Sequence, residues 1–370
     1  MFATGIDARD ASRSESADDV EIVAARDVPL GGPRGMTVRR TLPSKARSMV
    51  GAFCFVDHYG PDDVAATGGM DVPPHPHTGL QTVTWLFEGR VLHRDALGSV
   101  QEIAPGQLNL MTAGAGICHS EQATPGLFPT NGTLHGVQLW TALPSGTRDG
   151  ERAFEHVADL PSFVVHDASE RAEAASGEAA IGEAASGEAA SGEAASGRHR
   201  ARSVGPREAG LVRVFMGSLG GVTSPARADT PLVAAQLDLA PGVVVRLDVE
   251  ESFEHAVLVD RGALRLEGAS VPVASLGYVP LGRSTLELRT GDEPVRAVLI
   301  GGEPFEEQVL MWWNFVGRTH EEVVEARRLW QDAVAGGAEG EARFGRVTGY
   351  AGAPLPAPEL PHVRLRPRSR

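Results

Sequence analysis

The sequence has little cysteine, a deficit of basic residues and no long apolar run, and each absence excludes a class of protein. Its 370 residues include only Cys54 and Cys118, and 34 Lys and Arg stand against 48 Asp and Glu, for a net charge of −14. Two cysteines cannot build a disulfide framework. An acidic chain is repelled by phosphate backbones and anionic membranes, so we expect no direct nucleic-acid or membrane binding. No stretch approaches a membrane-spanning helix, and the N-terminus lacks the regions of a signal peptide. We therefore expect a soluble, cytoplasmic protein.

The length predicts two domains, and a pentapeptide repeat marks the linker between them. Residues 173–197 read as five copies of EAASG, one of them EAAIG, with a glycine in every copy. Each such glycine costs a helix about 1 kcal/mol, so the repeat predicts a flexible linker. The sequence thus divides into a disordered tail (1–20), a first domain (21–165), the linker (166–205), a second domain (206–335) and an extended tail (336–370).

Short β-rich segments, broken by glycine and proline, lie on both sides of the linker. They cover residues 81–87, 90–93, 134–141, 243–249, 256–259 and 297–300. This spacing is typical of a β-barrel or a β-sandwich.

Near the C-terminus, Thr319 and Glu322 form a capping box, and apolar residues follow at helical spacing up to Gly336. One helix is predicted there.

Two pairs of side chains predict a metal site in the first domain. His75 and His77 follow a proline-rich turn, and His119 and Glu121 follow a glycine-rich one. In a strand, residues i and i+2 share a face, so each pair can point two ligands the same way. A single His-x-His pair has little weight among 12 histidines. On adjacent strands, however, the two pairs would supply three imidazoles and a carboxylate to one divalent ion and leave positions open for substrate.

Several segments resemble the pirin family of the cupin superfamily. They are FCFVDHYGP (53–61), HPHTGLQTVTWLFEG (75–89), HRDALG (93–98), AGAGICHSE (113–121), LHGVQLWTALP (134–144) and MWWNFVGRTHEEV (311–323). The resemblance implies an all-β bicupin: two facing β-barrels with a short C-terminal helix and one metal, in the N-terminal cupin only. Carried over residue by residue, it makes His75, His77, His119 and Glu121 the ligands. Fe(II) is the expected ion, and the ligand types leave Ni, Cu, Mn and Zn open.

Other residues of these segments have alternative interpretations. Gln81 stands where many pirins have Glu, and either supports the metal ligands or is a packed amide. Cys118 is interpreted as a core residue rather than a redox sensor. His58, His93 and His135 are interpreted as hydrogen-bonded barrel residues rather than catalytic ones. The second domain offers only the isolated His255, so no second metal is expected there.

The resemblance implies an oxidoreductase of the quercetin 2,3-dioxygenase type. Such an enzyme would open a flavonol or a similar enolisable aromatic substrate with O2, and Glu121 would be the catalytic base that takes the proton of the 3-hydroxyl. The alternative is a metal- or redox-responsive regulatory protein that binds a partner protein, of the transcriptional co-regulator type. A third hypothesis is a metal-stabilised bicupin without activity. A monomer is expected.

Overall fold

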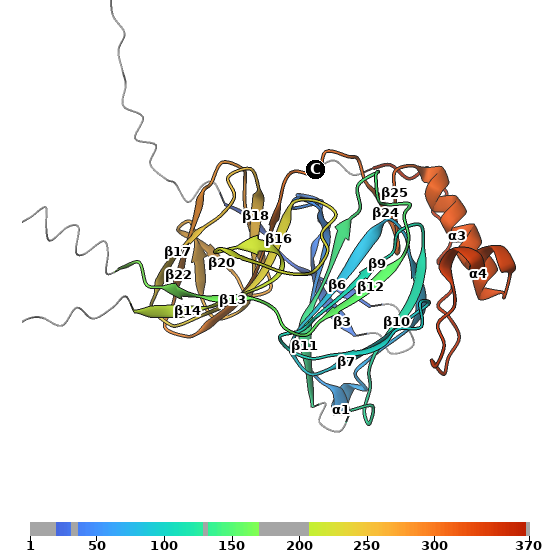
Figure 1. The fold of residues 1–370 in the computed structure, drawn as a ribbon, viewed down its shortest axis with the longest axis horizontal. Coiled ribbons are helices and arrows are strands. Elements are labelled where there is room, and N and C mark those ends of the chain that lie inside the picture. Colours follow the sequence, from blue (N-terminus) through green and yellow to red (C-terminus); the bar gives the residue numbers. More distant parts are fainter. Residues whose placement is uncertain (1–19, 31–35, 129–131, 170–206, 368–370) are drawn as a thin grey trace, which may run out of the picture.

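Two β-barrels lie side by side in the computed structural model, which describes residues 20–30, 36–128, 132–169 and 207–367 (Figure 1). The predicted all-β bicupin is confirmed. The six predicted strand segments coincide with strands of the structure. Residues 1–19 of the predicted tail and residues 170–205 of the predicted linker lie outside the described residues.

The first barrel consists of a seven-stranded and a four-stranded antiparallel sheet. The larger sheet has the order β12 (Ala153–Val157), β9 (Leu108–Thr112), β6 (Leu80–Glu88), β11 (Thr133–Ala142), β4 (Phe53–Asp63), β3 (Thr37–Leu42), β2 (Arg26–Pro29). The smaller has the order β5 (Met70–His77), β10 (Ile117–Ala123), β7 (Val91–Asp95), β8 (Val100–Ile103). A single helical turn, α1 (Val64–Thr67), follows β4. Both predicted ligand pairs thus lie on the smaller sheet.

The second barrel repeats this plan and takes in two strands from outside the predicted second domain. Its larger sheet contains β1 (Glu21–Val23), β21 (Leu276–Val279), β18 (Glu254–Arg261), β23 (Val295–Gly302), β16 (Leu232–Leu239), β14 (Glu208–Leu219) and β13 (Ser162–His166), with β15 (Val222–Thr223) beside β14. Its smaller sheet contains β17 (Val244–Asp248), β22 (Thr285–Thr290), β19 (Leu264–Leu266) and β20 (Ala269–Val271). β1 pairs with β21, and β13 pairs with β14. Chain segments assigned to the first domain therefore complete the second sheet, because its edge strands need partners.

The two larger sheets pack against each other through an apolar interface. Trp85 of β6 stacks on Phe215 of β14 with ring centroids 4.5 Å apart, and its Nε1–H donates to Gln236 Oε1 over 2.7 Å. Val83 and Trp85 face this interface, whereas Leu86 faces the inside of the first barrel. Both faces of β6 are therefore buried, which explains its continuous apolar run.

Two helices cover the flank of the first barrel that lies away from the second barrel (Figure 1). They are α3 (His320–Val334) and α4 (Ala338–Phe344), and they follow the hairpin of β24 (Leu310–Trp312) and β25 (Phe315–Gly317). The Thr319 side chain accepts the Glu322 amide over 3.2 Å, so α3 begins as the capping box predicts. The prediction of a wholly extended tail at 336–370 is wrong for α4, because Phe344 is buried against Trp330 there.

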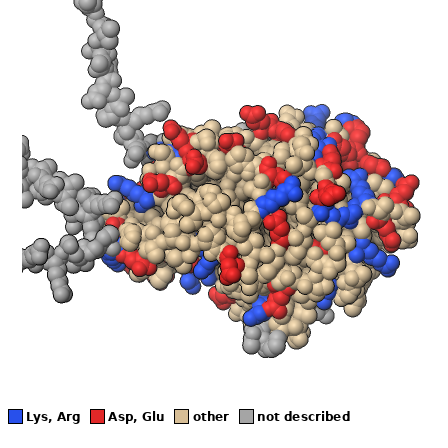
Figure 2. All heavy atoms as spheres, in the orientation of Figure 1, with Lys and Arg blue, Asp and Glu red and all other residues tan. Residues whose placement is uncertain are grey.

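The described residues contain no helix that is long and apolar enough to cross a bilayer. On the face drawn in Figure 2, acidic and basic side chains are interspersed over the first barrel and its helices.

Candidate metal centre

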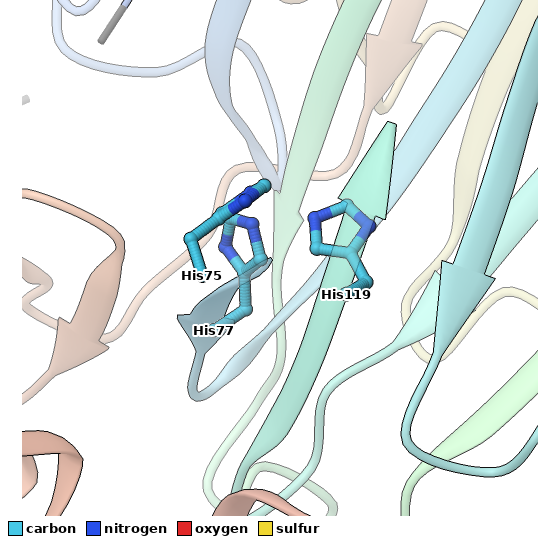
Figure 3. Close-up of side chains that lie close together, drawn as sticks. All are labelled: His75, His77 and His119. Atoms are coloured by element: carbon cyan, nitrogen blue, oxygen red, sulfur yellow. The ribbon is translucent and has the colours of Figure 1, made fainter. Parts of the chain in front are cut away.

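Three histidines converge inside the first barrel, from two adjacent strands. On the β5–β10 ladder His75 lies opposite His119, and His77 lies opposite Ile117. The ring centroids are 4.3 to 5.0 Å apart, and the three imidazoles face one another (Figure 3). Each ring offers a nitrogen within 4.8 Å of the other two. The structure thus brings together the three histidines that the sequence singled out.

The hydrogen bonds of His75 leave one of its nitrogens free. The Pro73 carbonyl lies 2.8 Å from His75 Nδ1 and accepts its proton. The pairing shifts from His75 to Val72 between His119 and Glu121, so β5 carries one extra residue there. The bulge lies at Pro73 and Pro74, and the Pro73 carbonyl is the group that bonds to the ring. Nε2 of His75 therefore carries the lone pair that a metal requires.

A chain of hydrogen bonds from Asp95 through His93 leaves one nitrogen of His119 free as well. His93 Nε2 lies 3.1 Å from Asp95 Oδ2, and His93 Nδ1 lies 3.4 Å from His119 Nδ1. Because the carboxylate accepts from Nε2, Nδ1 of His93 is an acceptor, and His119 donates to it through Nδ1. His119 Nε2 keeps its lone pair. Sequence reasoning missed the role of Asp95, although His93-x-Asp95 has the same i, i+2 spacing as the ligand pairs.

Two nitrogens of the cluster lack partners among the described residues. His77 Nδ1 and His119 Nε2 are buried and form no hydrogen bond. An unpaired polar atom in a protein interior is costly. Orphaned nitrogens on neighbouring imidazoles fit a site that receives a cation, and the donor set suits a first-row divalent metal.

Glu121 lies beside this cluster in a second group, formed with His93 and His119. Its Oε1 accepts from the Thr84 hydroxyl over 3.1 Å, and the same hydroxyl lies 3.2 Å from Gln138 Oε1. The carboxyl is buried, with 7% of the residue exposed. The inclusion of Glu121 in one ligand set with the three histidines stays a prediction.

Burial shifts the pKa values of the three histidines and of Glu121 in the direction that favours the neutral form of each side chain. It lowers the pKa of His75 to about 4 and holds the pKa values of His77 and His119 well below their usual range. Burial also raises the pKa of Glu121, against the opposing effects of His93 and Thr84. Neutral imidazoles are the form that binds metal, so the histidines are ready as ligands at neutral pH.

A cavity of about 290 Å³ opens beside the cluster. Its polar lining residues are the three histidines, Tyr59, Glu121, Gln138, Asn314 and the ion pair of Arg40 with Asp57. Its apolar wall includes Val28, Leu30, Val38, Met70, Val72, Phe55, Trp140, Trp313 and Leu355. Trp140 stacks on Phe55 at 3.9 Å and meets the His77 ring edge to face at 5.0 Å. The cavity therefore combines an apolar, partly aromatic wall with polar groups at the cluster, which is the usual make-up of a small-molecule site.

Known proteins are similar to this chain in sequence and in fold. Residues 35–141 match the family model "Pirin", and residues 234–336 match "Pirin C-terminal cupin domain". The chain is 37% identical over 340 residues to "Putative quercetin 2,3-dioxygenase PA1205" of Pseudomonas aeruginosa, covering 92% of this chain and 90% of that protein. The chain belongs to the pirin family.

Two further comparisons agree with that membership. A "Pirin-like protein" of Caulobacter vibrioides is 32% identical to this pirin over 305 residues. The match covers 80% of this chain and 88% of the Caulobacter protein. A crystal structure of quercetin 2,3-dioxygenase from Acinetobacter baumannii superposes with a TM-score of 0.76 at 34% identity, and covers 95% of this chain and 98% of its own.

The remaining residues singled out from the sequence of this pirin lie away from the cluster. Gln81 bonds to Thr112, Thr141 and the Arg227 carbonyl, which is the packed-amide alternative. Cys118 is buried beneath α3, and burial raises the pKa of its thiol to about 12. His255 is buried in the second barrel, and neither of its ring nitrogens has a hydrogen-bond partner among the described residues.

His58 and His135 belong to a buried polar cluster between the two barrels. The Nε2 atoms of both rings lie 2.7 Å from Asp260 Oδ1, and Arg296 Nε donates to Asp260 Oδ2 over 2.6 Å. The histidines come from the first barrel and the ion pair from the second. The cluster therefore joins the barrels. His58, His135 and Asp260 also lie close enough together to share an ion, but Asp260 is already paired with Arg296, and Arg296 lies 3.3 Å from His135 Nδ1.

Proposed function

We propose that this pirin is a metal-dependent dioxygenase of the quercetin 2,3-dioxygenase type, with its active site at His75, His77, His119 and Glu121. The observation that carries the proposal is the convergence of three neutral imidazoles at the end of an aromatic-lined cavity. The relatives named for quercetin 2,3-dioxygenase activity support the reaction class. Fe(II) is the proposed ion.

The three histidines would hold the ion through nitrogens that the surrounding hydrogen bonds leave free. His75 is oriented by the Pro73 carbonyl, and His119 is oriented by His93. When bound, a divalent ion supplies positive charge that favours loss of a proton from a coordinated hydroxyl. The rest of the chemistry is the work of the chain's own side chains.

Glu121 would accept the proton of the flavonol 3-hydroxyl. Its pKa is raised by burial, which makes its carboxylate a stronger base than an exposed glutamate. The Thr84 hydroxyl donates to Oε1 and fixes the direction of the carboxyl group. The aromatic wall of Phe55 and Trp140 would hold the rings of the substrate and exclude water. O2 is the oxidant: two carbon–carbon bonds of the central ring break, both oxygen atoms enter the ester product, and one carbon leaves as CO.

The test is oxygen uptake and CO release by Fe(II)-loaded protein supplied with quercetin. The wild type should consume one O2 for each CO released. Glu121→Gln should lower turnover by roughly 10²–10⁴ while it changes metal occupancy far less, because a general base contributes about that factor. Glu151→Gln, on the exposed surface, is the matched control and should match the wild type.

Two results would count against the proposal. If Glu121→Gln lost metal and turnover equally, Glu121 would be a ligand and not a base. If the wild type consumed no O2 with any of a broad panel of flavonols, the enzyme proposal would fail, and redox-dependent binding of a partner protein would become the leading hypothesis.

A further inference from the structure

The chain after α4 runs back across α3 to the rim of the cavity. We call residues 349–358 the strap. The Tyr350 hydroxyl donates to Asp71 Oδ1 over 2.9 Å, at the start of β5. On α3, the Gln331 side-chain oxygen accepts the Ala357 amide over 2.8 Å. The strap is therefore held at both ends, whereas the sequence predicted only an extended tail.

Leu355 is the strap residue that lines the cavity, and its backbone is fixed on both sides. Its amide donates to the Pro74 carbonyl over 2.8 Å, and its own carbonyl accepts the Trp330 indole N–H over 2.8 Å. Pro74 directly precedes the proposed ligand His75. Because both backbone groups are paired, a change of side chain at residue 355 alters the width of the cavity without releasing the strap.

The Leu355 side chain is a part of the cavity wall that does not come from the barrel itself. It contacts the apolar cluster of the barrel interior together with Val28 and Leu30, and it is only partly buried. Trp313 also lines the cavity from outside the barrel, at the turn between β24 and β25. Trp313 has a φ of 52°, a backbone conformation that costs a non-glycine residue energy. Two large apolar side chains from outside the barrel, Leu355 and Trp313, thus line the cavity.

We infer that Leu355 is a specificity-determining residue that limits how large a ligand can reach the three histidines. The inference rests on the metal site of the proposed function and adds to it the size of the substrate. Leu355 offers only an apolar side chain to the cavity, so it acts on a bound ligand through the room that it leaves. A ligand with three rings needs more of that room than a ligand with one ring, and it should respond more strongly to the size of residue 355.

The experiment compares two probes that share one metal-binding head. They are a one-ring 3-hydroxy-4-pyranone and the three-ring 3-hydroxyflavone, titrated anaerobically into full-length Co²⁺-loaded protein and followed by the visible spectrum of the ion. The variants are Leu355→Trp, Leu355→Ala and the control Leu360→Ala. Leu360 belongs to the same C-terminal segment but packs against the cluster under α3 and does not line the cavity.

Leu355→Trp should weaken 3-hydroxyflavone binding by about tenfold or more and change pyranone binding by less than about twofold, since steric misfit in a pocket gives discrimination of that size. Leu355→Ala should shift the ratio of the two dissociation constants the other way, and Leu360→Ala should leave it unchanged. The inference is overturned if Leu355→Trp changes both probes equally or neither, or if Leu360→Ala gives the same ratio as Leu355→Trp.

The same proteins separate this inference from the proposed function. If the ratio shifts as expected but Fe(II)-loaded protein takes up no O2 with 3-hydroxyflavone, the proposed function fails and the role of Leu355 stands. If O2 uptake is normal and the ratio does not move, the role of Leu355 alone fails.

Discussion

At the scale of single residues, the chain Asp95–His93–His119 is the part of the site that can be tested most cleanly. In Asp95→Asn, the amide oxygen can still accept the Leu97 and Ser99 amides, as Oδ1 does now. The amide nitrogen cannot accept from His93 Nε2. The tautomer of His119 is then no longer fixed, and metal affinity should fall by about 10- to 100-fold.

A chelator competition titration with Co²⁺ measures this loss. The exposed Asp159→Asn is the control and should bind as the wild type does. Wild-type affinity in Asp95→Asn, with an unchanged visible spectrum of the bound ion, would show that His93 does not position His119.

His255 gives a second prediction at this scale, on the pH dependence of stability. Burial lowers its pKa to about 4, whereas the unfolded chain has the ordinary value of 6.5. The unfolded state therefore binds a proton that the folded state does not, and stability falls as pH drops through this window. Between about pH 8 and about pH 5, His255 should account for a loss of about 2 kcal/mol.

Urea unfolding of metal-free protein at both pH values checks this. His255→Leu should lose about 2 kcal/mol less than the wild type on acidification. It should also be at least as stable at the higher pH, because it removes a buried ring whose nitrogens have no partner among the described residues. The control His362→Leu, at an exposed residue, should lose as much free energy of unfolding between the two pH values as the wild type does. If His255→Leu lost as much free energy of unfolding on acidification as the wild type, the account would be contradicted.

The histidine site could be predicted from the sequence because the spacing of residues within one strand decides which side chains share a face. His75 and His77 share a face by the period of a strand, and so do His119 and Glu121. The register that sets His75 opposite His119 comes from the β5–β10 pairing, which residue spacing alone does not determine. The bulge at Pro73 and the partner Asp95 depend on that register, so they could not be predicted.

At the scale of elements, the cap of α3 supports the helix that anchors the strap. The Thr319 hydroxyl accepts the Glu322 amide, and Trp330 of the same helix holds Leu355. Thr319→Ala should lower the free energy of unfolding by about 1 kcal/mol, and Thr319→Ser, which keeps the oxygen, should lose much less. Urea unfolding measures both. Equal losses in the two variants would show that the methyl group, and not the cap, stabilises this end.

Element types were predictable, but element partners were less so. β6, β11 and β18 follow from apolar and β-branched runs between turns, and α3 follows from its capping box. β1 and β13 are short segments whose place in the second sheet depends on edges that form only when both barrels exist. The strap escaped prediction for the same reason: its partners Asp71, Pro74 and Trp330 are distant in sequence.

At the scale of the whole molecule, the cluster around Asp260 joins the two barrels electrostatically. Asp260 is 5% exposed and pairs with Arg296, His58 and His135. Asp260→Ala leaves the buried Arg296 without this partner and should cost about 3–5 kcal/mol. Thermal and urea unfolding report the loss. Replacement of both charges, as Asp260→Leu with Arg296→Met, should recover much of it, and a double variant as unstable as Asp260→Ala would contradict this role.

The most direct test of the central claim is a Co²⁺ titration of the full-length protein, monitored through the visible absorption of the bound ion. The account predicts one ion per chain in the wild type and loss of that site in His119→Gln, with the polar cluster at Asp260 taking up none. A wild type that binds no ion, or a His119→Gln variant that binds one with the same spectrum and affinity, would contradict it.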